Sequence, residues 1–584
     1  MFLQHDPLKN LATKSIQPLL SRLGVEWSDA DIYSALGPTP NRDLGHMAFA
    51  CFKLSKDLKK SPAQVSTELA GFVGDLPSGV AQIKAAGPYL NLFFDTGAVA
   101  KNMLPTILTG ELFTTKITNN TPKTMVEYSQ PNTHKEMHVG HMRNLCLGAA
   151  VIEMMKYAGF EIISSTFPGD VGTHVAKCLW YMKKHNTENP PASRKGAWLG
   201  QMYSRAHNLL EDQKGSEMED KNRAELTEIL KQLEKKQGEY FDLWIETRQW
   251  SIDLMNDVYQ WAGVKFDQWY WESEVDSASL KLVDEYFKKG LFIKDEGAIG
   301  CDLSEDKLGF CLLVKSDGNG LYATKDIELA RRKFQDHKIQ KSIYVVDKRQ
   351  AHHFAQVFKV LEKMGFKEAK DCFHLQYDFV ELPDGPMSSR KGNIIPIQAL
   401  IDQMKEMIKT EYLARYIGQW SEKEIEETAH IVSVGAIKFG MTRVDTTKKI
   451  VFDMKEWLKL DGESGPYIQY VYARIQSLLE KQGRIEKNFG ALSALSHPLE
   501  SQLVQKLLEF NSVVENAVTH YKTIPVTGYL YDVAKMFNSF YAELSVANAE
   551  TPELKVARLG LCEATGIILK KGLSILGVQS PDKM

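Results

Sequence analysis

The fold class is decided by residues 124–167, which read TMVEYSQPNTHKEMHVGHMRNLCLGAAVIEMMKYAGFEIISSTF. Short apolar runs at its two ends predict strands, and the longer middle segment carries apolar residues at helical spacing and stops at Gly159. The helical stripe consists of Met142, Leu145, Ala149 and Met154. A strand, a helix and a second strand in this order predict parallel strands in a doubly wound α/β sheet.

Strand and helix patterns resume in residues 341–365, which read KSIYVVDKRQAHHFAQVFKVLEKMG. We predict that the sheet domain spans residues 116–400 and that a charged helical segment is inserted in it at about residues 185–255. Residues 1–115 mix short helices and strands and predict an α+β module, whereas residues 401–584 are almost entirely helical in pattern. The chain is therefore predicted to be a multidomain α/β protein with an all-α C-terminal domain.

Local patterns outside the sheet domain predict individual elements. Residues 48–60 predict a helix with a basic end, and the alternating apolar residues of segment 90–94 predict a strand. Ser464 is the predicted N-cap of the helix that follows it. Gly572 follows two lysines and is the predicted C-cap of the last helix.

Composition limits the classes of function. The 584 residues are 43% hydrophobic and 25% charged, as in ordinary globular proteins, and the net charge of -3 excludes an overall basic field for nucleic acid. The seven cysteines are scattered without a close pair, so we expect no metal held by protein ligands. The chain has no signal-peptide pattern and no apolar run that could span a membrane, so we expect a cytoplasmic protein without membrane contact.

The sequence HVGH, residues 138–141, lies at the predicted junction between strand and helix. Two histidines three residues apart at a helix N-terminus can point to one side, and a glycine between them lets a phosphate approach the backbone. The arrangement predicts an ATP phosphate site made by His138, Gly140 and His141. A capping or core role is the alternative for these histidines taken alone, but the flanking strand and helix favour the nucleotide site.

A second candidate site is the segment MSSRKG, residues 387–392. Small residues and two cations, with glycines and prolines on both sides, predict a basic loop that can close on a triphosphate. The residues predicted to contact ATP are Met387, Ser388, Ser389 and Lys391, with Arg390 as a further cation. A solvated surface loop is the alternative when the segment is considered without the upstream HVGH.

The segment 126–173, from VEYSQPN to GDVGT, resembles the corresponding part of class I arginyl-tRNA synthetases nearly from end to end. Further similar segments are MAFACFKLSKDLKKSPAQV, GLYATKDIELA, VFDMKEWLKLDGESGPYIQYVYARIQ and LKKGLSILGVQSPDKM. The resemblance covers essentially the whole chain. It implies a Rossmann-like catalytic domain, an N-terminal additional domain that binds tRNA and a C-terminal anticodon-binding domain.

The resemblance also implies a reaction. Arginine–tRNA ligases activate L-arginine with ATP, release pyrophosphate and transfer arginine to the 3′ end of tRNA(Arg), and in this subgroup the activation step generally needs tRNA. Such a chain is usually a monomer. The residues that the resemblance places against arginine are Glu127, Asn132, Tyr322, Asp326 and Gln350. Paired acids suit this substrate, because a planar guanidinium is recognised best by carboxylates and amides at fixed angles.

Adenylate formation needs no nucleophilic side chain, so the catalytic residues would act by positioning ATP and neutralising charge, with Mg²⁺ bridging the phosphates. The resemblance assigns this role to His138, His141, Lys135, Arg390 and Lys391. The chain departs from the generic basic loop of class I enzymes at Pro386 and Ser389, which stand where that loop has lysines. Many arginine enzymes lack the second of these lysines, and the resemblance implies that Lys135 compensates for it.

The resemblance implies RNA contacts at both ends of the chain. Tyr470 and Arg474 offer a stacking surface and a cation for anticodon bases, and Lys59 and Lys60 are candidates for contact with the outer corner of the tRNA. A core position for the tyrosine and a solvated face for the lysines are the alternatives.

Four other functions compete with this one. A small-molecule nucleotidyltransferase shares the HVGH junction, but it would not need a helical domain after the basic loop. A catalytically inactive homologue that only binds RNA is disfavoured by the intact His138, His141, Glu127, Asp326 and Lys391. A cysteine-specific synthetase should carry zinc ligands, and a glutamate-specific one should offer cations in place of paired acids.

Overall fold

The computed structural model describes residues 3–383, 385–386, 395–486 and 488–584. The chain forms two compact units. One unit consists of Thr121–Leu458, and the other combines the two ends of the chain, Met1–Asn120 and Lys459–Met584. None of the helices in the described part of the chain has the length and apolarity that a membrane-spanning segment needs.

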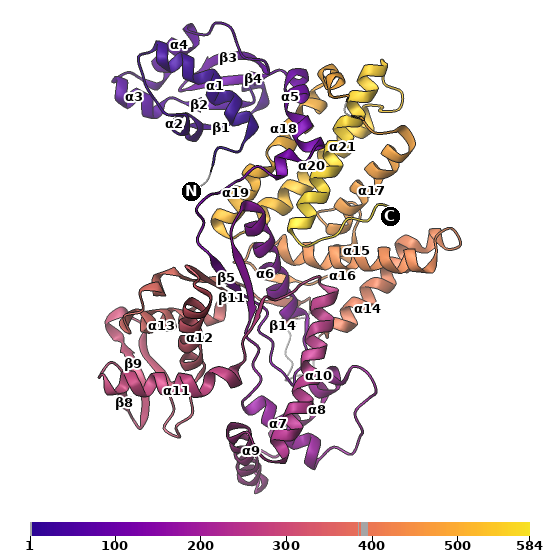
Figure 1. The fold of residues 1–584 in the computed structure, drawn as a ribbon. Coiled ribbons are helices and arrows are strands. Elements are labelled where there is room, and N and C mark those ends of the chain that lie inside the picture. The colour runs from indigo at the N-terminus through magenta and orange to yellow at the C-terminus, as the bar shows by residue number, and fades with distance from the viewer. Residues whose placement is uncertain (1–2, 384, 387–394, 487) are drawn as a thin grey trace. The chain divides into compact units, whose positions relative to one another are not determined.

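A five-stranded parallel sheet with the order β12-β11-β5-β6-β7 lies within the Thr121–Leu458 unit (Figure 1). Its strands are β5 (Thr124–Glu127), β6 (Ile162–Thr166), β7 (Gln268–Trp269), β11 (Lys341–Asp347) and β12 (Cys372–Tyr377). The chain runs from β5 through β6 to β7 on one side and returns through β11 to β12 on the other. Strand order thus reverses between β5 and β11, and ligands bind at such a switch point, beyond the carboxyl ends of the strands. The predicted parallel sheet is confirmed.

Helix α6 (Val139–Ala158) follows β5 and begins at the predicted HVGH junction. All four residues of the predicted stripe are buried. Gly159 ends the helix with a φ of +101°, a left-handed conformation that side-chain-bearing residues rarely adopt. Gly148 packs so closely on Tyr128 that a Cβ would come within 2.3 Å of its ring, which brings the helix directly against the end of β5.

The segment of chain between β6 and β7 forms four helices. They are α7 (Thr173–Lys184), α8 (Lys195–Asp212), α9 (Met218–Lys235) and α10 (Glu239–Trp261). The apolar stripe of α9 packs on α7, where Ile229 and Leu233 lie in one buried cluster with Leu179 and Trp180. Helix α8 packs against both α7 and α10, and this packing fixes the face that it turns toward the start of α6.

A small antiparallel sheet with the order β10-β9-β8 separates β7 from β11 in the chain, and the sequence analysis missed it. The elements of this region are α11 (Glu272–Lys288), β8 (Ile293–Asp295), β9 (Ala298–Leu303), β10 (Gly309–Val314), α12 (Tyr322–His337) and α13 (Ala351–Lys363). Leu303 and Leu313 of the sheet share a buried core with Ile327 of α12 and Val357 of α13. This core holds α12 and α13 against one another.

Two helices that the sequence pattern assigned to the C-terminal domain belong to the sheet unit. Helices α14 (Ile397–Ile408) and α15 (Glu422–Thr442) pack on α6, and α15 is buried continuously from Val432 to Thr442. The unit therefore continues to Leu458, beyond the predicted limit at residue 400. Helical periodicity identifies a helix but not the body on which its apolar face packs. The remaining elements here are β13 (Val380–Leu382), β14 (Gly385–Pro386), β15 (Ile450–Val451) and α16 (Met454–Leu458).

The N-terminal part of the other unit is an α+β module, as predicted, with an antiparallel sheet of order β1-β2-β4-β3. Its elements are α1 (Pro7–Arg22), α2 (Asp29–Ser34), β1 (Leu36–Pro38), β2 (Met47–Ala50), α3 (Phe52–Leu58), α4 (Pro62–Gly71), β3 (Val80–Ala86), β4 (Tyr89–Phe94) and α5 (Thr96–Leu108). The strand predicted at 90–94 is confirmed. The helix predicted at 48–60 is wrong at its start, because Met47–Ala50 pairs with β4 and the helix begins only at Phe52.

The C-terminal part of that unit is helical. Its helices are α17 (Gly465–Gln482), α18 (Pro498–Leu508), α19 (Phe510–His520), α20 (Ile524–Glu543) and α21 (Pro552–Ile575). The predicted N-cap is confirmed, because the Ser464 hydroxyl accepts a hydrogen bond from the Tyr467 N–H at 3.1 Å. The predicted C-cap is wrong. Helix α21 continues through Gly572 to Ile575, and Gly572 instead permits close contact with Leu530 of α20.

Replacing Gly572 with alanine should destabilise the protein. The new Cβ would lie 2.4 Å from Leu530 Cδ2 inside the helical core, and such overpacking typically costs about 1–3 kcal/mol. Gly528→Ala on α20 is the matched control, because nothing lies within 4 Å of its Cβ position. The control should leave stability unchanged or raise it, since alanine is the better helix former. Thermal unfolding of both variants checks this, and equal midpoints would contradict it.

Candidate active site

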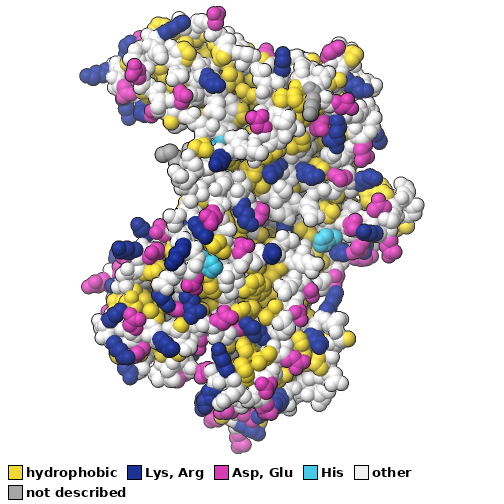
Figure 2. All heavy atoms as spheres, viewed as in Figure 1, with side chains coloured by type: hydrophobic (Ala, Val, Ile, Leu, Met, Phe, Trp, Pro, Cys, Tyr) yellow, Lys and Arg dark blue, Asp and Glu magenta, His cyan; other side chains and the backbone are white. Residues whose placement is uncertain are grey.

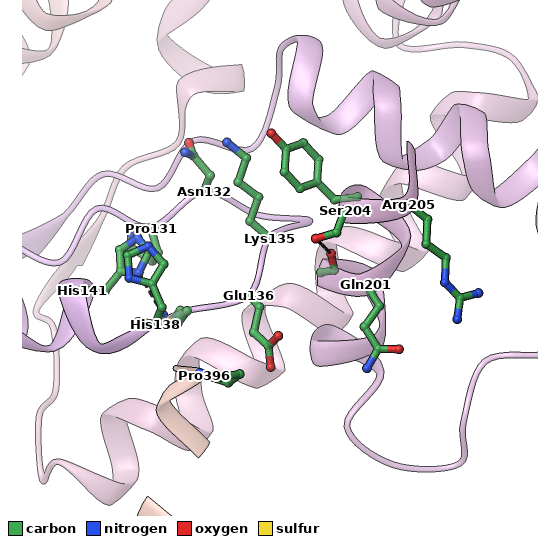
Figure 3. Close-up of a pocket in the computed structure, with 13 residues that line it drawn as sticks. Pro131, Asn132, Lys135, Glu136, His138, His141, Gln201, Ser204, Arg205 and Pro396 are labelled. Atoms are coloured by element: carbon green, nitrogen blue, oxygen red, sulfur yellow. Dashed lines mark hydrogen bonds between the residues drawn. The ribbon is translucent and has the colours of Figure 1, made fainter. Parts of the chain in front are cut away.

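The predicted phosphate site lies at the switch point of the parallel sheet. A cavity of about 580 Å³ opens there beside the start of α6. Its lining includes Asn132, Lys135, Glu136, His138, His141, Gln201, Ser204, Arg205 and Pro396. Figure 3 shows the two histidine rings side by side on one side of this cavity, with Gln201 and Ser204 of α8 on the other. The structure thus joins the predicted histidines to α8, a helix that sequence reasoning did not connect with the site.

The backbone fixes the orientation of both histidine rings. His138 Nδ1 accepts a hydrogen bond from the Gly140 N–H, and His141 Nδ1 accepts one from the His138 N–H, each at 3.1 Å. The ring centroids are 4.1 Å apart. A neutral imidazole that accepts at Nδ1 carries its proton on Nε2, so each ring presents an Nε2–H donor. Gly140 is needed here, because a Cβ would come within 2.8 Å of the His138 ring.

The histidines are neutral at physiological pH. Burial and the nearby charge of Lys135 lower the pKa of His138 to about 4. Burial is the main reason that the pKa of His141 also lies well below its usual value, and a positive charge on His138 or Lys135 beside it would disfavour its imidazolium form further. Each neutral ring can donate its Nε2–H to a phosphate oxygen without a change in protonation. Lys135 supplies the positive charge beside the two rings.

Lys135 is a cationic residue of the cavity lining. Its Nζ lies over the Tyr203 ring, 4.9 Å from the centroid, so the α8 tyrosine supports the lysine by a cation–π contact. The predicted basic loop, with Met387, Ser388, Ser389, Arg390 and Lys391, lies outside the described residues.

The described chain just after the basic loop is anchored to the histidine segment. The Val139 N–H donates to the Ile395 carbonyl and the Ile397 N–H donates to the Met137 carbonyl, each at 3.1 Å. His138 also forms an isolated antiparallel bridge with Pro396, which lines the cavity. The residues that follow the basic loop, Ile395 to Ile397, are therefore held next to the histidines.

Arg143 anchors a further part of the unit to the same helix, and sequence reasoning missed it. Its guanidinium donates to the carbonyls of Asp378, Lys448 and Asp445 at 2.6, 2.8 and 3.0 Å, and the residue is only 1% exposed. Burial lowers the pKa of Arg143 to about 10, which leaves it charged at neutral pH. No local pattern distinguishes Arg143 from a surface cation, because all three of its partners are distant in the sequence.

The residues predicted to bind arginine lie in several elements of the unit. Tyr322 and Asp326 share the first turns of α12, as predicted, and the Tyr322 side chain is open to solvent at 66% exposure. Asp326 Oδ2 lies 2.6 Å from His353 Nε2 on α13. Gln350 is exposed immediately before α13, and Asn132 lies beside Gly169 after β6, as the bridge between these two residues shows.

Glu272 is a further carboxylate near these residues that the sequence analysis missed. A Cβ on Gly169 would meet Asn132 Oδ1 at 2.3 Å and Glu272 Oε1 at 3.5 Å, which places the two side chains together. Burial raises the pKa of Glu272 to about 7; Lys325 at 3.4 Å opposes this shift, and Asp170 and Asp326 add to it. Asp170 is in turn paired with Arg248 at 2.8 Å, and Asp326 with His353 at 2.6 Å, so this region brings carboxylates and basic groups together.

Glu127 has a different environment from Asp326. It is 4% exposed, its carboxylate forms a buried ion pair with Lys333, and its other oxygen accepts from Gln130 Nε2 at 3.2 Å. Lys333 is fully buried and its Nζ lies 4.0 Å from the centroid of the Tyr344 ring. The structure therefore gives Glu127 an internal cation as its partner.

Three family models match the chain in sequence order. Residues 8–94 match the "Arginyl tRNA synthetase N terminal domain", residues 103–454 match "tRNA synthetases class I (R), catalytic domain", and residues 468–584 match the "DALR anticodon binding domain". The chain belongs to the class I arginyl-tRNA synthetase family. The family predicted from the sequence is thereby confirmed.

Individual arginyl-tRNA synthetases agree with this assignment over their whole length. The chain is 55% identical to an arginine–tRNA ligase of Bdellovibrio bacteriovorus over 584 residues, which is 100% of both chains. It is 33% identical to that of Porphyromonas gingivalis, with 99% of each chain covered. The fold is similar to that of the Thermus thermophilus arginyl-tRNA synthetase, with a TM-score of 0.79, 24% identity and coverage of 99% of this chain and 100% of that one.

The residues predicted to bind tRNA lie outside the sheet unit of this synthetase. Tyr470 is half-buried on α17, and the exposed Arg474 lies over the Tyr541 ring with its guanidinium carbon 4.9 Å from the centroid. Lys59 is exposed at the end of α3, and the neighbouring Lys60 forms an ion pair with Glu68 at 2.7 Å. Among the described side chains on the face shown in Figure 2, basic and acidic groups are interspersed.

Proposed function

We propose that this protein is an arginine–tRNA ligase, which activates L-arginine with ATP and transfers it to the 3′ end of tRNA(Arg). Family membership along the whole chain carries this proposal, because it includes a catalytic domain and an anticodon-binding domain. The cavity beside His138 and His141 supports it, because its neutral Nε2–H donors and Lys135 suit the phosphates of ATP.

In the proposed mechanism the arginine carboxylate attacks the α-phosphate of ATP, and pyrophosphate leaves. His138 and His141 donate hydrogen bonds to phosphate oxygens, and Gly140 lets these oxygens approach the start of α6. Lys135, Arg390 and Lys391 neutralise the charge that builds on pyrophosphate. Mg²⁺ would be held by the phosphates themselves, since no cluster of His, Cys, Asp and Glu with metal-binding geometry occurs within the described ranges.

Arginine recognition is proposed for the acids near the start of α12. Asp326 would pair with the guanidinium, Tyr322 would cover it, and Asn132 and Gln350 would hold the amino-acid head group. Glu127 would act with them from the end of β5. Because a guanidinium presents planar donors in a fixed fork, carboxylates and amides at fixed angles favour it over the single point charge of lysine.

The proposed RNA contacts are Tyr470 and Arg474 for the anticodon and Lys59 and Lys60 for the outer corner of the tRNA. The half-buried ring and the exposed guanidinium at the first pair, and the exposed lysines at the second, support this assignment. We propose that a single chain is the active form. Sedimentation of the protein with and without tRNA(Arg) tests this.

Charging of total tRNA with each of the twenty amino acids tests the proposed function. Only arginine should be transferred, and transfer of a different amino acid would contradict the proposal. An inactive RNA-binding homologue would charge none while still binding tRNA(Arg), so the same experiment separates the two functions.

Arginine activation should also require tRNA. If RNA binding completes the site by induced fit, exchange of pyrophosphate into ATP with arginine should be near background without tRNA and should appear when tRNA(Arg) is added. Non-cognate tRNA is the control and should not restore exchange. Full exchange in the absence of RNA would show that the site is complete without it.

A further inference from the structure

The Asp326 carboxylate already has a basic partner within the protein. His353, in the first turn of α13, places Nε2 2.6 Å from Asp326 Oδ2. The side chains are 25% and 18% exposed, so the pair lies at the border between the core and solvent. A guanidinium that binds Asp326 therefore meets a carboxylate that is already hydrogen-bonded to an imidazole.

The two acids proposed for arginine recognition differ in the base that holds them. Glu127 is paired with Lys333, whose side chain is fully buried. Asp326 is paired with a histidine that solvent can reach. An imidazole loses its proton near neutral pH, whereas an ammonium group in an ion pair does not. The Asp326 pair therefore contains a base that can change its charge near neutral pH.

Other ionisable groups lie near His353 and Asp326. On β12, His374 lies close enough for the charge of His353 to influence it, and its Nε2 bonds to the Val346 carbonyl at 3.0 Å. Tyr344 on β11 and Glu272 on α11 lie close enough to Asp326 for its charge to influence them. The remaining charged groups on α13 and the segment before it have their own partners: Lys348 with Asp378, Arg349 with Asp347, and Lys359 and Lys363 with Asp306.

Burial alone would lower the pKa of His353. The hydrogen bond and the negative charge of Asp326 outweigh burial, so the pKa is raised above the usual value. The imidazolium form is therefore favoured while the two side chains remain paired without another cation.

We propose that His353 is an internal counter-ion of Asp326, which releases its proton when the guanidinium of arginine binds to that carboxylate. The inference rests on the proposed role of Asp326 in arginine binding and makes His353 a positioning residue. The guanidinium keeps its charge, so the proton lost from His353 passes to solvent. The neutral imidazole then donates Nε2–H to Oδ2 and leaves Oδ1 for the guanidinium.

Proton release gives arginine binding a definite pH dependence. Below the pKa of His353, each unit of pH decrease should weaken arginine binding by up to about tenfold, because one proton must leave. Above this pKa the affinity should become constant. Arginine should thus bind more tightly as the pH rises through the titration of His353.

Calorimetric titration of the full-length protein with L-arginine between about pH 6 and 8 tests the proposal. The parent protein should show the predicted decrease in affinity at low pH. His353→Gln keeps a neutral donor of similar reach but cannot take up a proton, so its affinity should depend on pH clearly less than that of the parent, with Glu272 as the remaining group that titrates in this range. His374→Gln is the matched control, and it should keep the pH dependence of the parent.

Proton release can also be measured without any variant. Titration of the parent at one pH in two buffers of different ionisation enthalpy should give up to about one proton released per arginine, with the largest release below the pKa of His353. A value of zero throughout the range, or a pH profile that His353→Gln does not change, would overturn the proposal.

Asp326→Asn separates this inference from the proposed function. If the variant binds arginine as the parent does, Asp326 is not an arginine ligand and the pocket assignment fails together with the inference. If the variant binds arginine weakly but the parent releases no proton, the pocket assignment stands and only the role of His353 fails. ATP affinity, measured in parallel, should remain unchanged by His353→Gln at every pH.

Discussion

Glu127→Gln is expected to lower the free energy of unfolding by about 3–5 kcal/mol, because it leaves Lys333 as a buried cation without a counter-charge. Lys333 has 0% exposure, so water cannot replace the lost carboxylate. The Tyr344 ring already lies 4.0 Å from its Nζ in the parent protein, so this cation–π contact does not compensate for the lost carboxylate. Urea unfolding of the full-length protein, followed by fluorescence and circular dichroism, measures the change in the transition that includes the sheet unit.

The double variant Glu127→Gln with Lys333→Met shows whether the loss comes from the unpaired charge. Replacing a buried ion pair with uncharged groups of similar volume is often neutral, so the double variant should be more stable than Glu127→Gln alone. The control is Glu161→Gln, because Glu161 pairs with Lys123 at 3.2 Å and its side chain is 68% exposed. It should change stability by less than about 1 kcal/mol.

Glu127→Gln with the stability of the parent would contradict the structural role of this pair. If the stable variant also failed to bind arginine, Glu127 would be a ligand of the substrate and Lys333 its temporary partner. Arginine affinity should therefore be measured on every folded variant of this set.

Asp326→Asn is expected to weaken the use of arginine by about two to three powers of ten. When a guanidinium in a partly buried site loses its charged partner, the binding free energy becomes less favourable by roughly 3–4 kcal/mol. Each 1.4 kcal/mol corresponds to a factor of ten in affinity. ATP affinity should remain nearly unchanged, because the phosphates are proposed to bind at the start of α6. Arginine and ATP titrations, with the charging rate measured beside them, test both parts.

Lysine should not become a substrate of the Asp326→Asn variant. Its compact ammonium cannot occupy two donor positions of a site shaped for a planar fork. Asp336→Asn is the control, because Asp336 is exposed on the same helix. If Asp326→Asn charges arginine at the parent rate, Asp326 serves only as the internal partner of His353.

Local patterns predicted the start or the end of several helices. The helix after HVGH follows from its apolar spacing, and its end follows from Gly159 with a φ of +101°, a conformation available to glycine. The N-cap at Ser464 follows in the same way from one side chain and the N–H three residues later. These features depend on neighbours within one or two turns of chain, so the sequence is sufficient to identify them.

The wrong predictions have long-range causes. Gly572 fits a local C-cap pattern, but α21 continues through it, and the glycine instead permits close contact with Leu530 of α20. Residues 48–50 fit the start of a helix, but β4 offers them a strand partner. The apolar stripe of α15 predicts a helix, and only the packing on α6 assigns that helix to the sheet unit.

The sequence by itself determined the family of this protein, its parallel sheet, the strand-to-helix junction with His138 and His141, and the acids Asp326 and Glu127 as candidates for a cationic substrate. Only the tertiary structure decided what these acids contact, namely His353 for one and Lys333 for the other. The physical reason is that caps and periodicity act between residues close in the chain, whereas the partner of a buried charge is set by packing between α12, α13 and the central strands. That packing depends on the whole core, and no local pattern encodes it.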